Sequence, residues 1–507
     1  MKPNDYDVIL DCYTDEPSGY GVPPYLGVHQ RYTSAALDYL GRKHFYLTID
    51  DLRYAKNKKK EVPYGTTDIS TLNLSLNTKR ALSLLRKAKT IYIIMGCFVD
   101  YEYLSALPPR ASELYELLKE FKSPRKILFY VLGGAKEIPS DFFKTPLSHI
   151  VDEIVTGHTY NFLLKGEKSS FFPNYDLLAQ ITKRKIPILE QIKQPRIIEI
   201  ETMTGCDWAK CSFCIERVRH LPIVFRKVED ILKEVSSLYQ QGARYFRLGR
   251  NPNFYYYMRQ DVPKIEALLY GIRNCCPELK VLHIDNVSPQ SVVTPQGKEI
   301  TKLIVKYCTS GNVAPFGIES FDPLVRKINT LNATIDQIMK AIEILNEYGR
   351  EKGENGQPRF LPGINLIYGL PGQRPETLKY NLYYLNQILQ KFETQRLFFR
   401  KLCSPFGVSM REFSSSKETE EYKKWREEIY NNFAIPMLIK VFPKGTILKN
   451  ARIEVWQNGD SILRQLGTCP PRILLKNKLL PIGNEYDVII KGVVKHRTLV
   501  GEVINKN

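Results

Sequence analysis

Three cysteines lie within nine residues of one another, in the segment Thr202-Met-Thr-Gly-Cys206-Asp-Trp-Ala-Lys-Cys211-Ser-Phe-Cys214. Thiolates bind zinc and iron–sulfur clusters. A structural zinc ion needs four ligands, and the next cysteines, Cys275 and Cys276, are adjacent to each other and about 60 residues further on. Three thiolates can instead hold a 4Fe–4S cluster whose fourth iron stays open to a reacting molecule. The alternatives are a zinc site or simply buried thiols.

Glycines and polar residues follow several apolar runs further along the chain. They are Arg247-Leu-Gly-Arg250, Asp285-Asn286, Gly317-Ile-Glu-Ser320 and Gly363-Ile-Asn-Leu-Ile-Tyr-Gly-Leu-Pro-Gly372. Glycine after a strand most often marks a turn, and Asp285 could equally cap the next loop. Because the loops after parallel strands of a barrel gather at one end, these segments are candidates for binding a ligand beside the thiols.

Residues 1–165 predict a doubly wound α/β domain. Apolar runs typical of buried parallel strands occur at 7–12, 44–49, 90–95, 126–132 and 153–155, with helical patterns at 33–40, 78–89 and 111–121. Such sheets bind ligands at the carboxyl ends of their strands. The first long loop and the strand ends carry the candidate residues Gly19, Gly21, Gly96, Cys97, Gly133, Gly134, Gly157 and His158.

A second alternating series follows a predicted linker at 166–195, which contains three prolines. Strands are expected at 197–202, 244–248, 280–285, 313–319, 361–367 and 396–402. Helices are expected at 227–240, 261–274, 297–307, 334–350 and 375–391. Six such units predict a partial (β/α)6 barrel over residues 196–435, with its working residues in the loops after the strands.

The last segment, residues 436–507, changes character. Strand-like runs at 447–456, 473–475, 486–494 and 498–503 alternate with Pro/Gly turns and show no helical period. This pattern predicts a small β-barrel of the oligonucleotide/oligosaccharide-binding kind. Its part 441–507 has a formal charge of +6, from 11 Lys+Arg and 5 Asp+Glu.

The composition limits the class of protein. The chain has 507 residues, of which 43% are hydrophobic and 10 are cysteines, so it is globular and is not a disulfide scaffold. Its first residues do not read as a signal peptide, and no apolar run reaches the roughly 20 residues that span a bilayer. We therefore expect a cytoplasmic protein without a membrane partner. Its 73 Lys+Arg against 54 Asp+Glu favour an anionic or acidic partner.

The cysteine segment and the later glycine motifs together resemble the radical S-adenosylmethionine (SAM) superfamily. That resemblance implies a 4Fe–4S cluster held by Cys206, Cys211 and Cys214, although four residues separate the first two cysteines here where three are usual. It also implies that Phe213 lies against the adenine of SAM. The other SAM contacts that it implies are Arg247, Gly249, Arg250, Asp285, Glu319, Ser320 and Gly369.

Two subclasses place a domain before such a barrel. Methylthiotransferases hold a second cluster there on three cysteines, but the first 200 residues of this chain contain only Cys12 and Cys97. The chain instead resembles the cobalamin-dependent radical SAM methyltransferases, and the resemblance implies that cobalamin lies at the leading domain's strand ends. The Asp-x-His-x-x-Gly motif is absent, so we expect His29 to be a loop histidine and the cobalt to lack a lower protein ligand.

The resemblance runs over nearly the whole chain, including 11–27 and 246–252, and points to archaeal members that C-methylate a glutamine of methyl-coenzyme M reductase. It implies methylation of an sp³ carbon through a 5′-deoxyadenosyl radical and methylcobalamin. The implied partners are the alpha subunit of that reductase and an electron donor. An RNA-modifying radical SAM enzyme and a non-enzymatic zinc and nucleic-acid-binding protein remain the alternatives. We expect Tyr255–Tyr257, Cys308 and Cys403 to be packing residues.

Overall fold

The computed structural model describes residues 5–16, 19–20, 23–56, 71–96, 106–130, 143–169, 172–214, 216–217, 222–402 and 419–504. It divides into two compact units. The first unit comprises Met1–Thr204, Val218–Arg244 and Val408–Ser415, and the second comprises Gly205–Arg217, Tyr245–Gly407 and Ser416–Asn507. Among the described helices, none is both long and apolar enough to cross a lipid bilayer.

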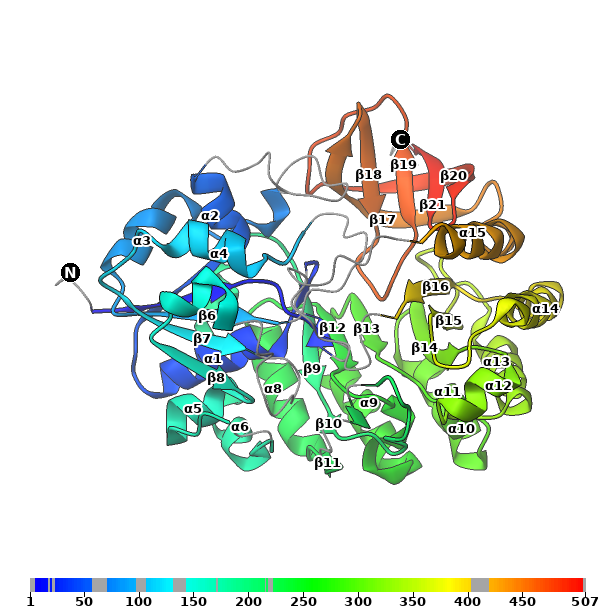
Figure 1. Ribbon diagram of the computed structural model, residues 1–507, viewed down its shortest axis with the longest axis horizontal. Helices are drawn as coiled ribbons and strands as arrows, with labels where there is room; N and C mark the ends of the chain where they lie inside the picture. The colour runs from blue at the N-terminus through cyan, green and yellow to red at the C-terminus, as the bar shows by residue number, and fades with distance from the viewer. Residues whose placement is uncertain are drawn as a thin grey trace. The chain divides into compact units, whose positions relative to one another are not determined.

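The first unit contains a five-stranded parallel sheet in the order β5-β1-β6-β7-β8 (Figure 1). The strands are β1 (Asp7–Asp11), β5 (His44–Thr48), β6 (Thr90–Met95), β7 (Arg125–Tyr130) and β8 (Glu153–Thr156). All residues of β1 and β6 are buried, which explains their nearly unbroken apolar sequence. In chain order this is 2-1-3-4-5, the order of a flavodoxin-like doubly wound sheet, so the predicted fold is confirmed.

Helices alternate with these strands, and the apolar positions of the second, third and fourth helices form one core with the sheet. The helices are α1 (Val28–Tyr39), α2 (Ile49–Ala55), α3 (Ala81–Lys87), α4 (Ala111–Leu118) and α5 (Thr159–Lys165). The start of α2 is fixed by a capping box, in which the Thr48 hydroxyl accepts the N–H of Asp51 and the Asp51 carboxylate accepts the N–H of Thr48. Helix α1 begins five residues before the predicted start at residue 33, so His29 lies in a helix and the expectation of a loop histidine is wrong.

The segment expected to be a linker contains ordered structure in the first unit. Residues 166–195 include α6 (Tyr175–Thr182) and a 3-10 helix, Pro187–Gln191. The same unit holds β4 (Tyr25–Leu26), which pairs in parallel with β9 (Ile197–Glu201), and the helix α8 (Val228–Gln240). Short antiparallel pairs join β2 (Asp15–Glu16) to β3 (Gly19–Tyr20) and β10 (Met203–Thr204) to β11 (Val224–Phe225). The predicted boundaries of the linker and the domains stay predictions.

The second unit continues the alternation of strands and helices. β12 (Tyr245–Gly249) pairs in parallel with β13 (Val281–Ile284), and β14 (Asn312–Glu319), β15 (Phe360–Tyr368) and β16 (Arg396–Lys401) form a parallel sheet. The longer helices are α9 (Val262–Cys275), α11 (Pro295–Tyr307), α13 (Ile335–Gly349) and α14 (Pro375–Lys391), and the shorter ones are α10 (Pro289–Val292) and α12 (Pro323–Ile328). The strand and helix series expected for a barrel is therefore present.

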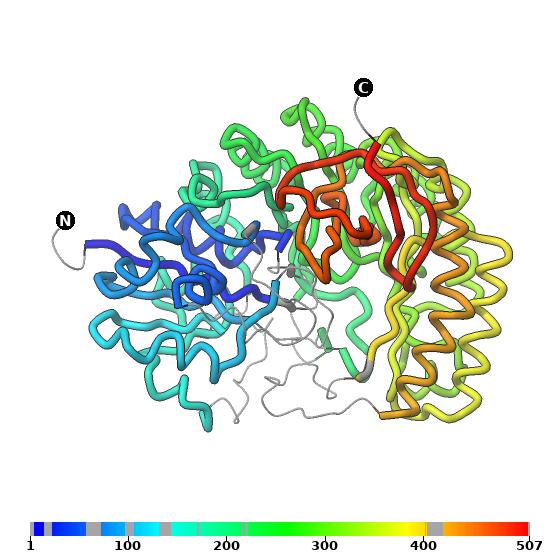
Figure 2. Tube along the Cα trace, turned by 90° about the horizontal axis from the view of Figure 1, so that it is seen from above, coloured from blue at the N-terminus to red at the C-terminus, as the bar shows by residue number. Residues whose placement is uncertain are grey.

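The chain ends in a closed five-stranded barrel of order β17-β18-β19-β21-β20, as expected for the terminal segment. Its strands are β17 (Ile447–Gln457), β18 (Asp460–Arg464), β19 (Arg472–Leu475), β20 (Glu485–Lys495) and β21 (Thr498–Val503). The sequence analysis did not identify β18, nor the helices α15 (Glu420–Ile429) and α16 (Ile435–Val441), which are joined by the π-helix Tyr430–Ala434. Figure 2 shows this helical stretch, in orange, beside α14 in yellow.

Candidate functional site

The three cysteines of the motif lie on one loop of the second unit, and each is half-buried. The loop is shaped by its own backbone. The N–H of Ala209 lies 3.3 Å from the Sγ atom of Cys206, and Ala209 has a left-handed φ of 49°. The N–H of Cys214 donates to the carbonyl of Cys211 at 3.2 Å. An N–H directed at sulfur favours the thiolate, which is the form that binds iron.

The segment that follows α12 anchors this cysteine loop. The N–H and the hydroxyl of Ser212 donate to the carbonyl and the side-chain oxygen of Asn329, at 3.1 Å and 2.5 Å. The indole N–H of Trp208 donates to the carbonyl of Thr330 at 2.8 Å. Asn329 is itself buried, and its amide donates to the carbonyls of Val325 and Pro371, both at 2.8 Å. One buried amide thus ties the cysteine loop to two other parts of the second unit.

The cysteine loop also contacts the segment after β12. The amide of Asn253 lies 3.3 Å from both carboxylate oxygens of Asp207. It also donates to the hydroxyl of Ser291 at 2.8 Å, while its oxygen accepts the N–H of Ser288 at 3.1 Å. Burial raises the pKa of Asp207. Asn253 therefore gives the loop another point of attachment.

Burial raises the pKa of all three thiols, to about 11 for Cys206 and about 12 for Cys211, with Cys214 also raised. Negative charge on Cys206 raises the pKa of the other two further, so the three thiolates repel one another. A cationic group bound to the sulfurs removes this cost. Within the described residues, no three Cys, His, Asp or Glu side chains converge on a single metal ion. A 4Fe–4S cluster binds each cysteine at a different iron, so the spread arrangement of these donors fits it.

Glu319, at the end of β14, lies close enough to Cys211 for its negative charge to raise the pKa of that thiol. Its backbone is strained, with a φ of 62°, and the β14–β15 register is irregular between Gly317 and Glu319. Burial raises the pKa of Glu319 to about 8, against the opposing charges of Arg400 and Arg326. The predicted SAM contact is therefore a buried carboxyl group beside the cysteine loop.

Arg326 forms hydrogen bonds with the segments on either side of Glu319. The sequence analysis did not identify Arg326. Its guanidinium donates to the carbonyls of Ile318 and Ser320, at 2.9 Å and 2.7 Å, and to that of Asn332 at 2.9 Å. It thereby connects the segment after β14 to the segment that anchors the cysteines. Arg326, Asn329 and Asn253 carry no motif that marks them, because their roles arise from contacts with distant parts of the chain.

Two other predicted SAM contacts, Arg247 and Asp285, form an ion pair with each other. Both side chains are fully buried, and burial raises the pKa of Asp285 while the charge of Arg247 lowers it. The backbone N–H groups of Arg250 and Asn286 also favour the ionised carboxylate. Arg250 is buried with a φ of 52°, and Gly249 ends β12. Burial outweighs these interactions, so the pKa of Asp285 is raised overall, and the charge of Arg247 limits the shift.

The remaining predicted SAM contacts have local structural roles. The hydroxyl of Ser320 accepts the N–H of Asp322 at 3.1 Å, in the turn before α12. Gly369 follows β15 with a φ of 90°, and its N–H donates to the side chain of Gln373. Phe213 is half-buried in the cysteine loop. Tyr255 and Tyr257 are fully buried and Cys308 is half-buried, as expected of packing residues.

In the first unit, β1 and β6 lie side by side where the strand order reverses, which is where such sheets bind ligands. Gly96 directly follows β6, and a Cβ atom there would lie 2.8 Å from the Cβ of Thr14. A glycine is therefore required by the neighbouring loop. The hydroxyls of Thr14 and Thr159 are buried and have no hydrogen-bond partner within the described residues, so both can accept or donate to a bound group.

The other candidates of the first unit are only partly described. Gly157 follows β8 with a φ of 95°, His158 is buried at the start of α5, and Gly19 lies in β3. Gly21, Cys97, Gly133 and Gly134 lie outside the described residues, as does Cys403. The unpartnered hydroxyls of Thr14 and Thr159 can hydrogen-bond a group bound at the strand ends.

Comparison with known proteins identifies a superfamily that matches part of the chain. Residues 200–380 match the Radical SAM superfamily. TsrM from Kitasatospora setae, a radical S-adenosylmethionine methyltransferase solved with cobalamin and a [4Fe-4S] cluster bound, has the same fold, with a TM-score of 0.53 and 14% identity over 80% of this chain and 77% of that one. The tRNA-2-methylthio-N(6)-dimethylallyladenosine synthase of Orientia tsutsugamushi is 23% identical over 52% of this chain and 57% of its own length.

Protein MJ0274 of Methanocaldococcus jannaschii is 35% identical to this chain, over 98% of this chain and 93% of its own length. The superfamily match covers the cysteine loop and the strands β12 to β15. The 4Fe–4S cluster and SAM are therefore cofactors of this protein. The fold and the cysteine loop agree with this match. The chain is therefore a radical SAM enzyme, and it belongs to the same family as MJ0274.

Proposed function

We propose that the enzyme is a cobalamin-dependent C-methyltransferase that methylates an unactivated sp³ carbon of a protein residue. The proposed target is a glutamine in the alpha subunit of methyl-coenzyme M reductase, with an electron donor as the second partner. The observation that carries the proposal is the presence, in one chain, of a radical SAM cysteine loop and a leading sheet in flavodoxin-like order. The fold that the chain shares with cobalamin-bound TsrM adds support.

The chemistry of the target explains why such an enzyme needs three cofactors. Polar methyl transfer requires a nucleophile, and an sp³ C–H carbon offers none. When bound, the cluster supplies the electron that splits SAM into methionine and a carbon-centred radical, and the corrin supplies the methyl group. In the balance, one substrate C–H becomes C–CH3 and the hydrogen leaves in 5′-deoxyadenosine, while a second SAM and a further electron from the donor would restore the methyl group on the corrin.

The residues of the cysteine loop would hold the cluster and fix its position. Cys206, Cys211 and Cys214 bind three irons, which leaves the fourth open for SAM. Asn329 and Asn253 restrict the movement of the loop through the contacts described above. Positioning of this kind matters because a displacement of about 1 Å at a reacting centre can cost about 100-fold in rate.

Glu319 is our proposed contact to the ribose or the methionyl group of SAM. Its carboxyl group is buried, and its negative charge raises the pKa of the neighbouring Cys211 thiol. Phe213, Gly249, Arg250, Ser320 and Gly369 stay proposed contacts. Arg247 and Asp285 pair with each other, so we propose that they have a structural role beside the SAM site. In the first unit, Thr14 and the strand ends near Gly96 and Gly157 would receive cobalamin.

The test is an anaerobic assay of the full-length protein, loaded with iron, sulfide and a corrinoid. A glutamine-containing peptide from the reductase is incubated with SAM and a reductant, and its mass is followed by mass spectrometry. We expect a gain of one methyl group, formed together with 5′-deoxyadenosine. Unchanged peptide during active SAM cleavage would remove the proposed target, and failure to bind any corrinoid would remove the proposed class.

A second candidate is an RNA-modifying radical SAM enzyme of the methylthiotransferase kind. The partial similarity to the Orientia tsutsugamushi tRNA-modifying enzyme and the closed terminal barrel favour it. The cysteine content opposes it, since residues 1–200 contain only two cysteines. Incubation with total tRNA under the same conditions separates the two, because only the second candidate would modify a nucleoside without corrinoid.

A further inference from the structure

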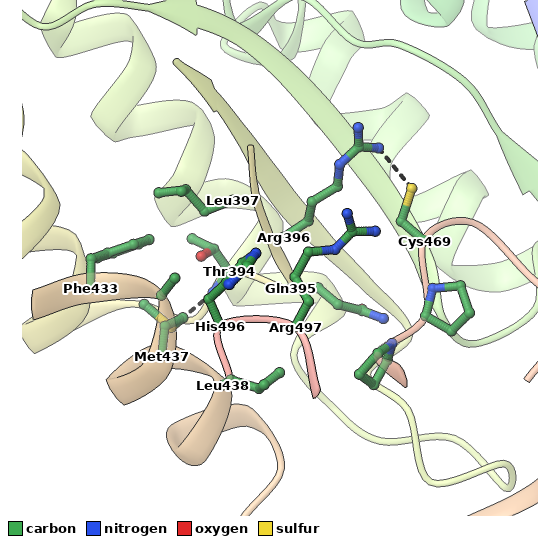
Figure 3. Close-up of a pocket in the computed structure, with 13 residues that line it drawn as sticks. Thr394, Gln395, Arg396, Leu397, Phe433, Met437, Leu438, Cys469, His496 and Arg497 are labelled. Atoms are coloured by element: carbon green, nitrogen blue, oxygen red, sulfur yellow. Dashed lines mark hydrogen bonds between the residues drawn. The ribbon is translucent and has the colours of Figure 1, made fainter. Parts of the chain in front are cut away.

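A cavity of about 30 Å³ lies in the second unit where β16 begins (Figure 3). Its walls come from three segments far apart in the chain: Thr394–Leu397, Cys469–Pro471 and His496–Arg497. The second segment is part of the loop between β18 and β19, and the third is the turn between β20 and β21. The helical stretch 433–438 closes the remaining side. The cavity therefore lies where the terminal barrel packs on the last strand of the preceding sheet.

Two arginines line this cavity and have no carboxylate partner within the described residues. Arg396 is 8% exposed, and its guanidinium donates to the Sγ atom of Cys469 at 2.7 Å. Arg396 and Arg497 both lie over the ring of Phe398, at 3.3 Å and 4.6 Å from its centroid. Arg396 is near enough to Asp285 to lower its pKa, but that carboxylate pairs with Arg247. A cation–π contact compensates only part of a buried charge.

The pKa values of the neighbouring groups report the same excess of positive charge. Burial and the charges of Arg472 and Arg396 lower the pKa of Arg497 to about 9. Burial and the charges of Arg497 and Arg472 lower the pKa of His496 to about 3, although its ring stacks on Tyr430 at 3.7 Å. Both groups thus lie in surroundings of positive charge, which favour the binding of an anion.

Unpartnered polar atoms belong to residues that line the cavity. The Nε atom of Arg396 and the hydroxyl of Thr394 are buried and have no hydrogen-bond partner within the described residues. Both groups can donate a hydrogen bond, whereas the unpartnered side-chain oxygen of Gln395 can only accept one. Buried donors are almost always satisfied in folded proteins. The Nε donor of Arg396 and the hydroxyl of Thr394, together with the guanidinium of Arg497, match the way proteins bind oxyanions.

We propose that this cavity is a binding site for a small free oxyanion of the phosphate class, held by Arg396, Arg497 and Thr394. The volume is larger than the roughly 10–15 Å³ that one water needs, and it is too small for a nucleoside or a corrin. The bound anion joins β16 to two loops of the terminal barrel, so it stabilises the way that barrel packs within the second unit. The site is independent of the proposed methyl transfer.

The test uses the purified full-length protein without added cofactors. Thermal unfolding is compared in sodium phosphate and in sodium chloride at equal ionic strength, and the affinity for inorganic phosphate is measured by calorimetry. We expect phosphate to raise Tm and Arg497→Gln to weaken phosphate binding at least tenfold. The matched control is Lys478→Gln, which removes one exposed positive charge from the same barrel and should leave binding unchanged.

A second measurement keeps the proposal testable if Arg497→Gln alters folding. Without phosphate, this variant should unfold at a higher temperature than the wild type, because it removes an uncompensated charge, and saturating phosphate should reverse the order. Equal Tm values in the two salts, or unchanged phosphate affinity in Arg497→Gln, would overturn the proposal. Binding of a short RNA at least tenfold tighter than phosphate, lost in Arg497→Gln, would also overturn it in favour of a nucleic-acid site.

Discussion

The cysteine loop and the cavity at the start of β16 both collect groups of one charge sign in the second unit. The first gathers three thiols beside Glu319, and the second gathers Arg396 and Arg497. Two other groups of buried charges are neutralised internally, namely the pair Arg247–Asp285 and the contacts of Glu234 with Arg31 and Arg226. Buried charges that pair with each other have a structural role. We propose that unpaired charges of one sign instead bind a ligand of the opposite charge.

The two regions differ in how they can be recognised. The cysteine loop is one continuous segment, so its three sulfur donors can be recognised within nine residues of the sequence. Its expected ligand is a cationic cluster. The cavity is assembled from segments about 70 and 100 residues apart in the chain, around residues 396, 469 and 497. Its expected ligand is an anion. The predictions below test whether charge compensation separates structural residues from ligand-binding ones.

The largest effect is expected at the cysteine loop. Cys211→Ala should abolish 5′-deoxyadenosine formation and lower bound iron, because two thiolates no longer enclose the cluster. Iron content and SAM cleavage under anaerobic conditions measure this. Cys308→Ala, which changes a half-buried cysteine outside the loop, serves as the control. SAM cleavage retained in the Cys211 variant would contradict the ligand assignment.

The next effect concerns a charge that the chain neutralises itself. Asp285→Asn should lower the free energy of unfolding by about 3–5 kcal/mol, because it leaves Arg247 buried and unpaired. The double variant Arg247→Met/Asp285→Leu should recover most of this loss. Denaturant unfolding of both variants measures it. If the double variant is stable and cleaves SAM normally, the pair is structural; if it is stable and inactive, one of the two residues contacts SAM.

A smaller effect is expected at the anchor of the cysteine loop. Asn329→Ala should lower stability by about 1–3 kcal/mol and also reduce cluster retention, because it frees Ser212 and the carbonyls of Val325 and Pro371. Asn346→Ala is the matched control, since Asn346 is a buried asparagine that bonds the carbonyls of Ile342 and Glu393. Equal iron loss in the two variants would show that Asn329 has no specific link to the cluster.

The last effect is a pH dependence at His283, which is smallest near neutral pH and grows as the pH falls. Burial lowers its pKa to about 3, and the N–H of Thr468 donates to its Nδ1 atom at 2.9 Å. The unfolded chain, with a pKa near 6.5, binds the proton more readily, so stability is present above pH 6.5 and falls as pH decreases toward 3. We expect a loss of about 1.4 kcal/mol per pH unit below 6.5, measured as the difference from His283→Gln. Parallel pH profiles would contradict it.

Much of the fold could be predicted because its signals are local. The apolar run Thr90–Met95 coincides with β6, and the pattern at 375–391 coincides with α14. Helix α1 was predicted too short because its first turn, which includes His29, carries no apolar pattern. The helices from Glu420 to Val441 were missed for a similar reason, since α15 is rich in charged residues and buries only a narrow stripe.

The sequence by itself indicated most of the strands and helices, a small terminal barrel and the three cysteines, because these depend on residues that are neighbours in the chain. Only the tertiary structure decided that Arg247 pairs with Asp285, that Asn329 anchors the cysteines and that Arg396 meets Arg497 at a cavity. Burial and charge depend on which distant segments pack together, and local periodicity carries no information about that packing.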